Sequence, residues 1–240
     1  MRFLYKLRDV REIAPWGPPE DRNLHWFGLS DGAYCVDTVA GRLLEHTDAL
    51  DAQLGVSWCS YAVVRLFEDL LEAWPHIVEP VPPDVTARFF AWAGDPRAGV
   101  PDDDDLAAAW FEAHGWWGMR KVDLGYLVGA PALYFWSSGA KIHLRWRADE
   151  TWVVQRADLI EPQADFRAAA HGFVNSFLGE MRERVETIAR DGWSGKPCRI
   201  DIPQLVAEQD KREAQARKAL GLVAQTDWDH VRRMFDFLGA

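Results

Sequence analysis

The stretch APALYFWSSGAKIHLRWR, residues 130–147, decides the fold class of this chain. Its second half, 141–147, alternates strictly between polar and apolar residues, which is typical of a strand with one buried face. A Ser-Ser-Gly turn separates this half from the apolar run 130–136, and a short Ala-Asp-Glu turn leads to a third run at 151–156. Short strands joined by such tight turns predict an antiparallel three-stranded meander.

The polar face of the strand at 141–147 is cationic. It consists of Lys141, His143, Arg145 and Arg147. Such a row repels itself unless acidic groups lie opposite, so the favoured interpretation is a solvated sheet face balanced by nearby Asp and Glu. The other interpretation is a site for an anionic ligand, because arginine can hold a carboxylate or phosphate in bidentate fashion. In that case Arg145 and Arg147 would hold the anionic group, and His143 would be the acid–base candidate.

A second β signal lies near the N-terminus, in LHWFGLSDGAY at 24–34. Its Asp-Gly pair is favoured in the type I′ turn of a hairpin. A phosphate-binding loop is excluded here, because the stretch has neither the GxGxxG nor the P-loop pattern. The predicted strands in this region are therefore one at 2–8 and a hairpin of 24–30 with 33–39.

Helices are predicted around these strands. Ser57 can cap a helix over 58–74, Pro75 ends it, and its wide apolar arc makes it central to the fold. Further helices are predicted at 84–93, 103–114, 165–190 and 203–220, with one more after Thr226. The long helix at 165–190 carries an apolar stripe from Phe166 to Ile188, and Gly192 lies where it should end. Strands and helices do not alternate regularly, which indicates an α+β fold with antiparallel pairing. We expect an α+β domain over 1–192 and a helical C-terminal extension, 193–240, packed on it.

Composition narrows the function classes. The chain has 240 residues, of which 48% are hydrophobic, and a formal net charge of −10. This acidic balance argues against a nucleic-acid partner and is compatible with a basic protein partner. Three widely separated cysteines without a CxxC motif fit a reducing cytoplasm. No segment suits a signal peptide or a membrane span, so we expect a soluble cytoplasmic protein without membrane contact.

The sequence carries no catalytic signature, and no catalytic residue is assigned. Its seven histidines form no HExxH, HxH or close His/Cys cluster, so neither a metal site nor a cofactor is predicted. The acidic run 102–105 is interpreted as the start of a helix, because acids in a first turn complement the helix macrodipole. Cys59 is interpreted as a small buried residue.

Tryptophan is abundant, with 13 residues, and core packing accounts for most of them. Trp116 and Trp117 lie in the aromatic turn HGWWGMRK. Adjacent positions do not easily direct both rings into one core, so we expect one ring at the surface, as interface anchors often are. With His143, Arg145 and Arg147, these two residues form the candidate ligand-binding set.

Three features together carry a resemblance: HWFGLSDGAY, the later LYFWSSGAKIHLRWR, and the long helix after it. The chain resembles a family of uncharacterised bacterial proteins with a WFGLTDG-type N-terminal hairpin and a later strand pair of this kind. The likeness spans residues 12–190, and it implies no activity and no site residue. In style the chain is similar to immunity proteins of bacterial toxin systems, which are small, acidic, tryptophan-rich and α+β.

Two function hypotheses follow. The leading one is a non-enzymatic cytoplasmic protein-interaction module, of the immunity or antitoxin kind, that neutralises a basic partner. The alternative is an enzyme or small-molecule-binding protein, with an aromatic-lined site at the basic strand face for an anionic ligand. The sequence carries no indication of oligomeric state.

Overall fold

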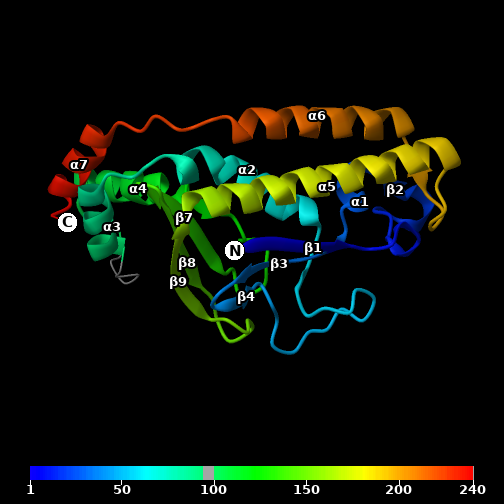
Figure 1. Cartoon of the computed structure of the whole chain (residues 1–240), viewed down its shortest axis with the longest axis horizontal. Helices are drawn as coiled ribbons and strands as arrows, with labels where there is room; N and C mark the ends of the chain where they lie inside the picture. The colour runs from blue at the N-terminus through cyan, green and yellow to red at the C-terminus, as the bar shows by residue number, and fades with distance from the viewer. Residues whose placement is uncertain (94–99, 240) are drawn as a thin grey trace.

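The computed structural model describes residues 1–93 and 100–239, and the fold is α+β (Figure 1). The first sheet is antiparallel, with β3 pairing β1 on one side and both β4 and β5 on the other. Its strands are β1 (Arg2–Leu7), β3 (Gly32–Thr38), β4 (Gly41–Leu43) and β5 (Cys59–Ser60). The second sheet is an antiparallel meander of β6 (Lys121–Val122), β7 (Ala132–Ser138), β8 (Lys141–Arg147) and β9 (Arg156–Pro162). A two-residue parallel ribbon joins β2 (Asn23–Leu24) to β10 (Arg199–Ile200).

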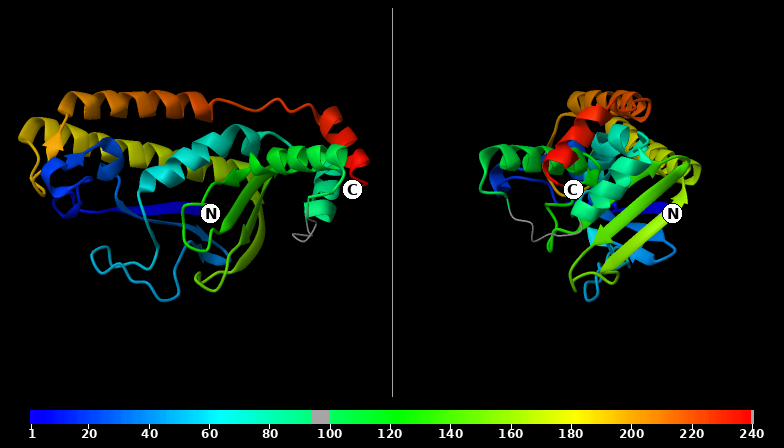
Figure 2. Two further views of the ribbon diagram at one scale, coloured as in Figure 1. Left: turned by 180° about the vertical axis from the view of Figure 1, so that it is seen from behind. Right: turned by 90° about the vertical axis from the view of Figure 1, so that its left-hand side faces the viewer.

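The helices gather along one side of the sheets (Figures 1 and 2). They are α1 (Trp26–Leu29), α2 (Val63–Val78), α3 (Pro83–Ala93), α4 (Asp104–Gly118), α5 (Gln163–Asp191), α6 (Ile202–Leu220) and α7 (Trp228–Phe237), and 3₁₀ turns lie at Val10–Glu12 and Pro19–Asp21. Within the described residues, no helix is both long and apolar enough to cross a bilayer.

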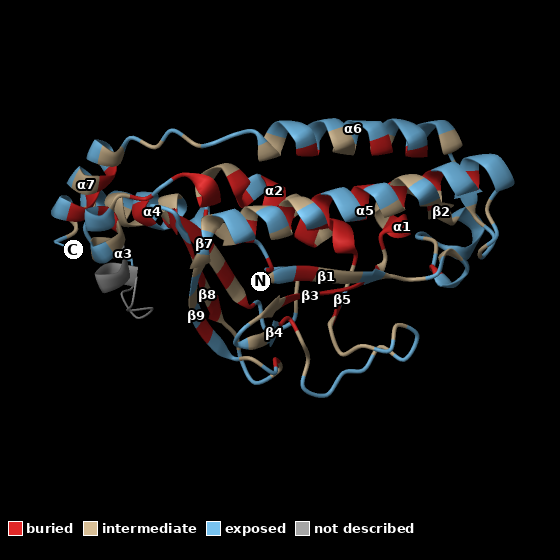
Figure 3. Cartoon of the chain, viewed as in Figure 1, coloured by how far each residue is buried: buried red, intermediate tan, exposed pale blue. Residues whose placement is uncertain are grey.

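The main core lies between the sheets and helices α2 and α5. The apolar stripe predicted for the long helix is buried along its whole length, and Phe166 stacks on Trp74 of α2 at 5.9 Å between ring centroids. The predicted stop is confirmed, because Gly192 has a φ of 82°, which favours glycine. Figure 3 shows the buried residues of α6 on the side that faces α5. There Gln209 accepts a hydrogen bond from Trp26 Nε1 at 2.8 Å and donates to Leu178 O at 3.0 Å.

A buried ion pair anchors the segment between α6 and α7. Arg120 Nη2 donates to Glu79 Oε2 at 3.0 Å, and Arg120 is fully buried. Glu79 also accepts hydrogen bonds from the backbone N–H and the hydroxyl of Thr226, each at 2.6 Å. Burial lowers the pKa of Arg120 to about 10, and the nearby Glu79 opposes that shift. Arg120 therefore stays charged near neutral pH and fastens Thr226 to the end of α2.

The predicted N-terminal hairpin is wrong. Residues 24–30 do not pair with 33–39; most of them form the single turn α1, and β3 pairs instead with β1 and then with β4. The His25 ring explains the helical turn, because its Nδ1 accepts a hydrogen bond from the N–H of Gly28 at 3.2 Å. Asp31-Gly32 leads instead into β3, which pairs with β1. Gly32 does not have the positive φ that a type I′ turn requires.

Gly32 is required by close approach of the backbone. A Cβ atom at this position would lie 2.2 Å from the carbonyl oxygen of Lys6. Because that neighbour belongs to the paired strand β1, it cannot rotate away. We expect Gly32→Ala to lower the free energy of unfolding by about 1–3 kcal/mol. Urea unfolding measures this, with Gly179→Ala as the control, because Gly179 is exposed, has no positive φ either, and its added Cβ would meet nothing within 4 Å.

Three other boundaries also differ from the predictions. The third meander strand is β9 at Arg156–Pro162 rather than 151–156, because Trp152 turns into the core and stacks on His46 at 4.2 Å. Helix α2 begins at Val63, since Cys59 and Ser60 pair with β3, and it continues through Pro75 because Ile77 and Val78 are buried beyond it. Helix α4 runs on past the predicted end at 114 to Gly118, so Trp116 and Trp117 lie within the helix.

Candidate functional site

The cationic strand face is partly neutralised by a carboxylate on the neighbouring strand. Asp158 of β9 lies opposite Arg145 and accepts its Nε–H at 3.1 Å. It also accepts two hydrogen bonds from Arg147 Nη2, at 2.9 and 2.7 Å, and Arg156 Nε lies 3.7 Å away. Burial raises the pKa of Asp158, but the hydrogen bonds from Arg147 and Arg145 outweigh it and hold that pKa below its ordinary value. One carboxylate therefore serves three guanidinium groups.

The structure does bring the predicted aromatic and cationic residues onto one sheet face. His143 stacks on Trp136 at 4.9 Å between ring centroids, and Trp117 stacks on Tyr134, which is paired with Arg145. Burial, and then the charge of Lys141, lower the pKa of His143, so its ring is neutral near pH 7. The ring can still accept or donate a proton, but it is packed on tryptophan.

The expectation that Trp116 or Trp117 is a surface anchor is wrong. Trp117 is buried, and Trp116 is half-buried beneath the Arg120 guanidinium, whose Cζ lies 4.4 Å from the centroid of its ring. Both rings pack in one small cluster with α7, where Trp228 and Phe235 meet Trp116 edge to face. Adjacent rings share a core here because α4 lies between the sheet and α7.

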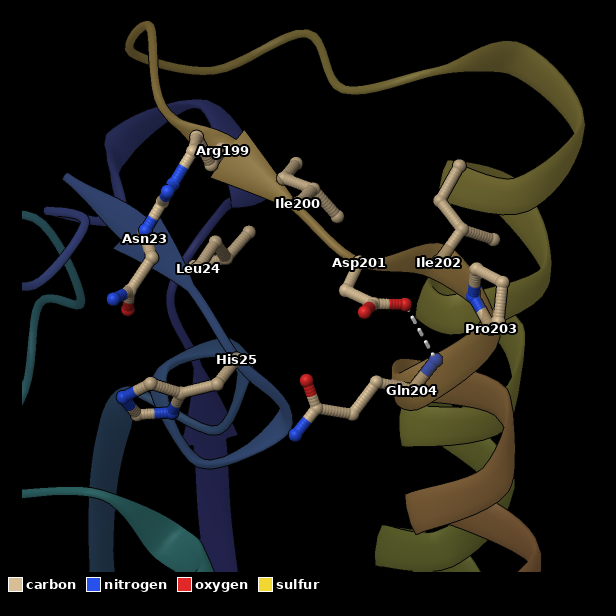
Figure 4. Close-up of a pocket in the computed structure, with 9 residues that line it drawn as sticks. All are labelled: Asn23, Leu24, His25, Arg199, Ile200, Asp201, Ile202, Pro203 and Gln204. Carbon is tan, nitrogen blue, oxygen red and sulfur yellow. Dashed lines mark hydrogen bonds between the residues drawn. The ribbon is translucent and has the colours of Figure 1, made fainter. Parts of the chain in front are cut away.

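A groove of about 730 Å³ lies where β2 meets β10, and Figure 4 shows its lining. The ionisable side chains that line this groove already stabilise the fold. Asp201 caps α6 by accepting the Gln204 N–H at 2.9 Å, Arg199 pairs with Asp21 at 2.7 Å, and His25 caps α1. In Figure 4 the Gln204 side chain extends from α6 towards His25. The groove therefore offers shape and amide groups rather than a reactive residue.

A buried acid–phenol cluster lies between α2, β3 and the loop after β6. Tyr34 and Tyr126 share a hydrogen bond of 3.0 Å between their hydroxyl oxygens, and Tyr126 also bonds with Asp69. Tyr34 bonds in turn with the Cys59 thiol, whose pKa burial raises to about 12. Cys59 is 1% exposed, which confirms its interpretation as a small buried residue. The cluster therefore presents a carboxyl group at one end, backed by phenols.

Asp69 is the residue that sequence analysis missed. The helical spacing groups it with the solvent-facing residues Arg65, Glu68 and Glu72, yet it is only 9% exposed. Its Oδ2 atom is buried and has no hydrogen-bond partner among the described residues. Burial raises its pKa to about 7, and the charge of Asp123 adds to this, against the hydrogen bond of Tyr126. No local signal identifies Asp69, because the residues that cover it are distant in sequence.

Asp69 lines a cleft of about 310 Å³ between α2, the end of α4 and β6. The other lining residues are Glu72, Ala73, Gly118, Met119, Lys121 and Asp123. Three carboxyl groups thus face one lysine ammonium group across a small space. No group of three or more His, Cys, Asp or Glu side chains suited to a metal ion is found in residues 1–93 and 100–239.

The outward face of α4 leads from this cleft to the acidic run at the start of the helix. Asp103 caps the helix by accepting the N–H of Leu106 at 3.0 Å, and all four aspartates at 102–105 are exposed. This confirms the interpretation of the run as a helix start. At the middle of the face Phe111 is 59% exposed, and Met119 at its end is 55% exposed. We call Asp102–Asp105, Phe111 and Met119 the α4 surface.

Comparison with known proteins identifies the family of the chain but no activity. The model of a family of unknown function, DUF5984, matches residues 2–234, which is nearly the whole chain. The chain belongs to DUF5984. This agrees with the expectation of an uncharacterised family. No curated protein and no solved structure matches this DUF5984 chain.

Proposed function

We propose that the chain is a non-enzymatic protein-binding module that neutralises a basic partner protein, in the manner of a bacterial immunity or antitoxin protein. The observation that carries the proposal is the α4 surface. It presents two large apolar side chains to solvent, with exposed carboxylates at one end and the Asp69 cleft at the other. An exposed aromatic side chain with a charged surround is the usual composition of a protein-binding hot spot.

Charge supports a basic partner. The chain carries a formal net charge of −10, so its long-range field attracts cationic proteins and speeds their association. The cationic strand face is partly balanced by Asp158, which pairs with both Arg145 and Arg147, and the chain as a whole remains acidic. The same pairing weakens the alternative of an anion-binding site on β8, since an incoming anion would have to compete with a carboxylate already in place.

A cytoplasmic location is part of the proposal. Cys35, Cys59 and Cys198 are all free thiols, which is compatible with a reducing bacterial cytoplasm. A cytoplasmic immunity protein would meet its toxin before export, or after the toxin had entered the cell.

Affinity capture from an extract of the source bacterium tests the function. The expected result is one basic protein held in a stoichiometric complex that dissociates as salt is raised, because salt screens charges between the two surfaces. Phe111→Ser should weaken the complex about tenfold or more. The matched control is Val39→Ser, since Val39 is 88% exposed on the β3–β4 turn, far along the chain from α4.

Two outcomes would contradict the proposal. One is capture of no basic protein by the wild-type chain in low salt. The other is equal loss of the complex in Phe111→Ser and Val39→Ser, which would mean that any exposed apolar side chain contributes as much as the α4 surface.

A further inference from the structure

The cleft beside α4 holds a carboxyl group, that of Asp69, which forms no ion pair with the described residues. Asp69 sits at the cleft with an unpartnered, buried Oδ2 atom, and Tyr126 bonds with the same carboxyl group. Native proteins seldom leave such an oxygen without a partner, so each case points to a missing donor. Arg65 on α2 is not this donor, because its guanidinium group lies over two aromatic rings. Its Cζ atom is 5.5 Å from the centroid of the Tyr126 ring and 5.7 Å from that of Phe27.

The mouth of the cleft is acidic as well. Glu72 is exposed on α2 one turn after Asp69, and Asp123 is exposed beyond β6. Asp123 is held in place because its Oδ1 accepts the N–H of Gly125 at 3.0 Å. The apolar part of the lining, Ala73 and Met119, suits the alkyl stem of a long side chain. Lys121 is the one cation that lines the cleft among the described residues.

We propose that this cleft receives a single lysine or arginine side chain, whose stem lies along Met119 and whose cationic head meets Asp69, Asp123 and Glu72. The inference deepens the proposed function and rests on it only for the source of the cation, a basic partner protein. A cationic head is the right ligand because it supplies hydrogen-bond donors to carboxyl oxygens and offsets their mutual repulsion. The volume of about 310 Å³ accommodates one such side chain and no large cofactor.

Binding is coupled to a proton. Asp69 is protonated below about pH 7, so a cation that enters there expels the proton of that carboxyl to solvent. The affinity for the cation therefore rises between pH 6 and pH 8 and then levels off. The charged and titratable groups that face Asp69 are Arg65, Glu68 and Glu72 on α2, Lys121 on β6, Asp123 and Tyr126 after it, and Tyr34 and Cys59 behind them.

The test uses the full chain and n-butylguanidinium, a mimic of the arginine side chain, followed by amide NMR shifts. The expected result is saturable shifts at Ala73, Gly118 and Met119, with an affinity that increases from pH 6 to pH 8. Neutral n-butylurea, which has a similar shape, should bind at least about tenfold more weakly. Shifts of equal size with both compounds would overturn the proposal.

Variants separate the cleft from the general acidity of the chain. Asp69→Asn should abolish the pH dependence. Asp123→Asn, at an exposed position where the amide oxygen can still accept the Gly125 N–H, should weaken binding severalfold. Lys121→Met should strengthen it, because a competing cation is removed. Asp48→Asn, on the exposed loop after β4, makes the same charge change elsewhere and should have no effect. Equal effects of Asp123→Asn and Asp48→Asn would overturn the cleft assignment.

The experiments distinguish failure of the cleft assignment from failure of the proposed function. If n-butylguanidinium does not bind the cleft while a basic protein is still captured through Phe111, the cleft assignment is wrong and the proposed function stands. If the probe binds as expected and no basic protein is captured, the cleft is a cation site and the proposed function is wrong.

Discussion

Replacing Arg120 by methionine is expected to lower the free energy of unfolding by about 3–5 kcal/mol. The substitution keeps the stem of the side chain but leaves the buried Glu79 carboxylate without its cation. Glu79 keeps only Thr226 as a donor, and the Trp116 ring loses the guanidinium that lies 4.4 Å from its centroid. The anchor of Thr226 on the end of α2 is weakened, although the hydrogen bond from the Ala224 N–H to Pro75 O remains. The uncompensated buried charge makes this the largest single effect that we expect on stability.

Urea unfolding measures the effect, with Arg2→Met as the matched control. Arg2 pairs with Asp37 at 2.6 Å but its side chain is exposed, so that variant should lose no more than about 1 kcal/mol. Adding Glu79→Leu to Arg120→Met should restore part of the loss, because the uncompensated buried charge is then removed. An Arg120→Met protein as stable as Arg2→Met would show that the buried pair does not hold the segment.

Replacing Asp69 by asparagine is expected to stabilise the protein at pH 8 and to have little effect near pH 4. In the unfolded chain this carboxyl group titrates near its ordinary value of about 4, whereas in the folded chain its pKa is about 7. Between these two values the folded state holds a proton that the unfolded state has lost. The stability of the wild-type protein therefore falls as the pH rises through this window, and above pH 7 the deficit is complete.

The expected gain for Asp69→Asn at pH 8 is about 2–4 kcal/mol, from the three-unit window and the free energy of each pH unit. Unfolding by urea at pH 5, 6, 7 and 8 measures it, and Asp48→Asn on an exposed loop should show no such trend. A stability difference between Asp69→Asn and wild type that is constant from pH 5 to pH 8 would mean that Asp69 is ionised in the folded protein throughout.

Repeating patterns of polar and apolar residues correctly predicted the helices and strands that are determined by residues close together in the sequence. The alternation in 141–147 placed β8 correctly, and the stripe from Phe166 onward placed α5, because each pattern repeats over several turns or pairs. The predicted N-terminal hairpin failed because the partner of β3 is β1, some 30 residues earlier in the chain, rather than the segment that precedes Asp31. Turn chemistry at Asp-Gly carries no information about a distant strand.

The candidate site was predictable in part, for the same reason. The cationic row on β8 is visible in the sequence, but the acid that neutralises it, Asp158, lies beyond the predicted end of the third strand. Asp69 lies among charged residues at helical spacing and is buried only because Tyr126 and the end of α4 meet α2 there. Phe111 was predicted only as part of a helix, since exposure depends on how that helix packs against α7.

A photo-crosslink made in living cells of the source organism tests most directly whether the α4 surface binds a basic protein. A photoreactive phenylalanine analogue is placed at position 111, and in a parallel strain at position 39. We expect one covalent adduct with a single basic protein from position 111 and none from position 39. No adduct from position 111, or the same adducts from both positions, would contradict it.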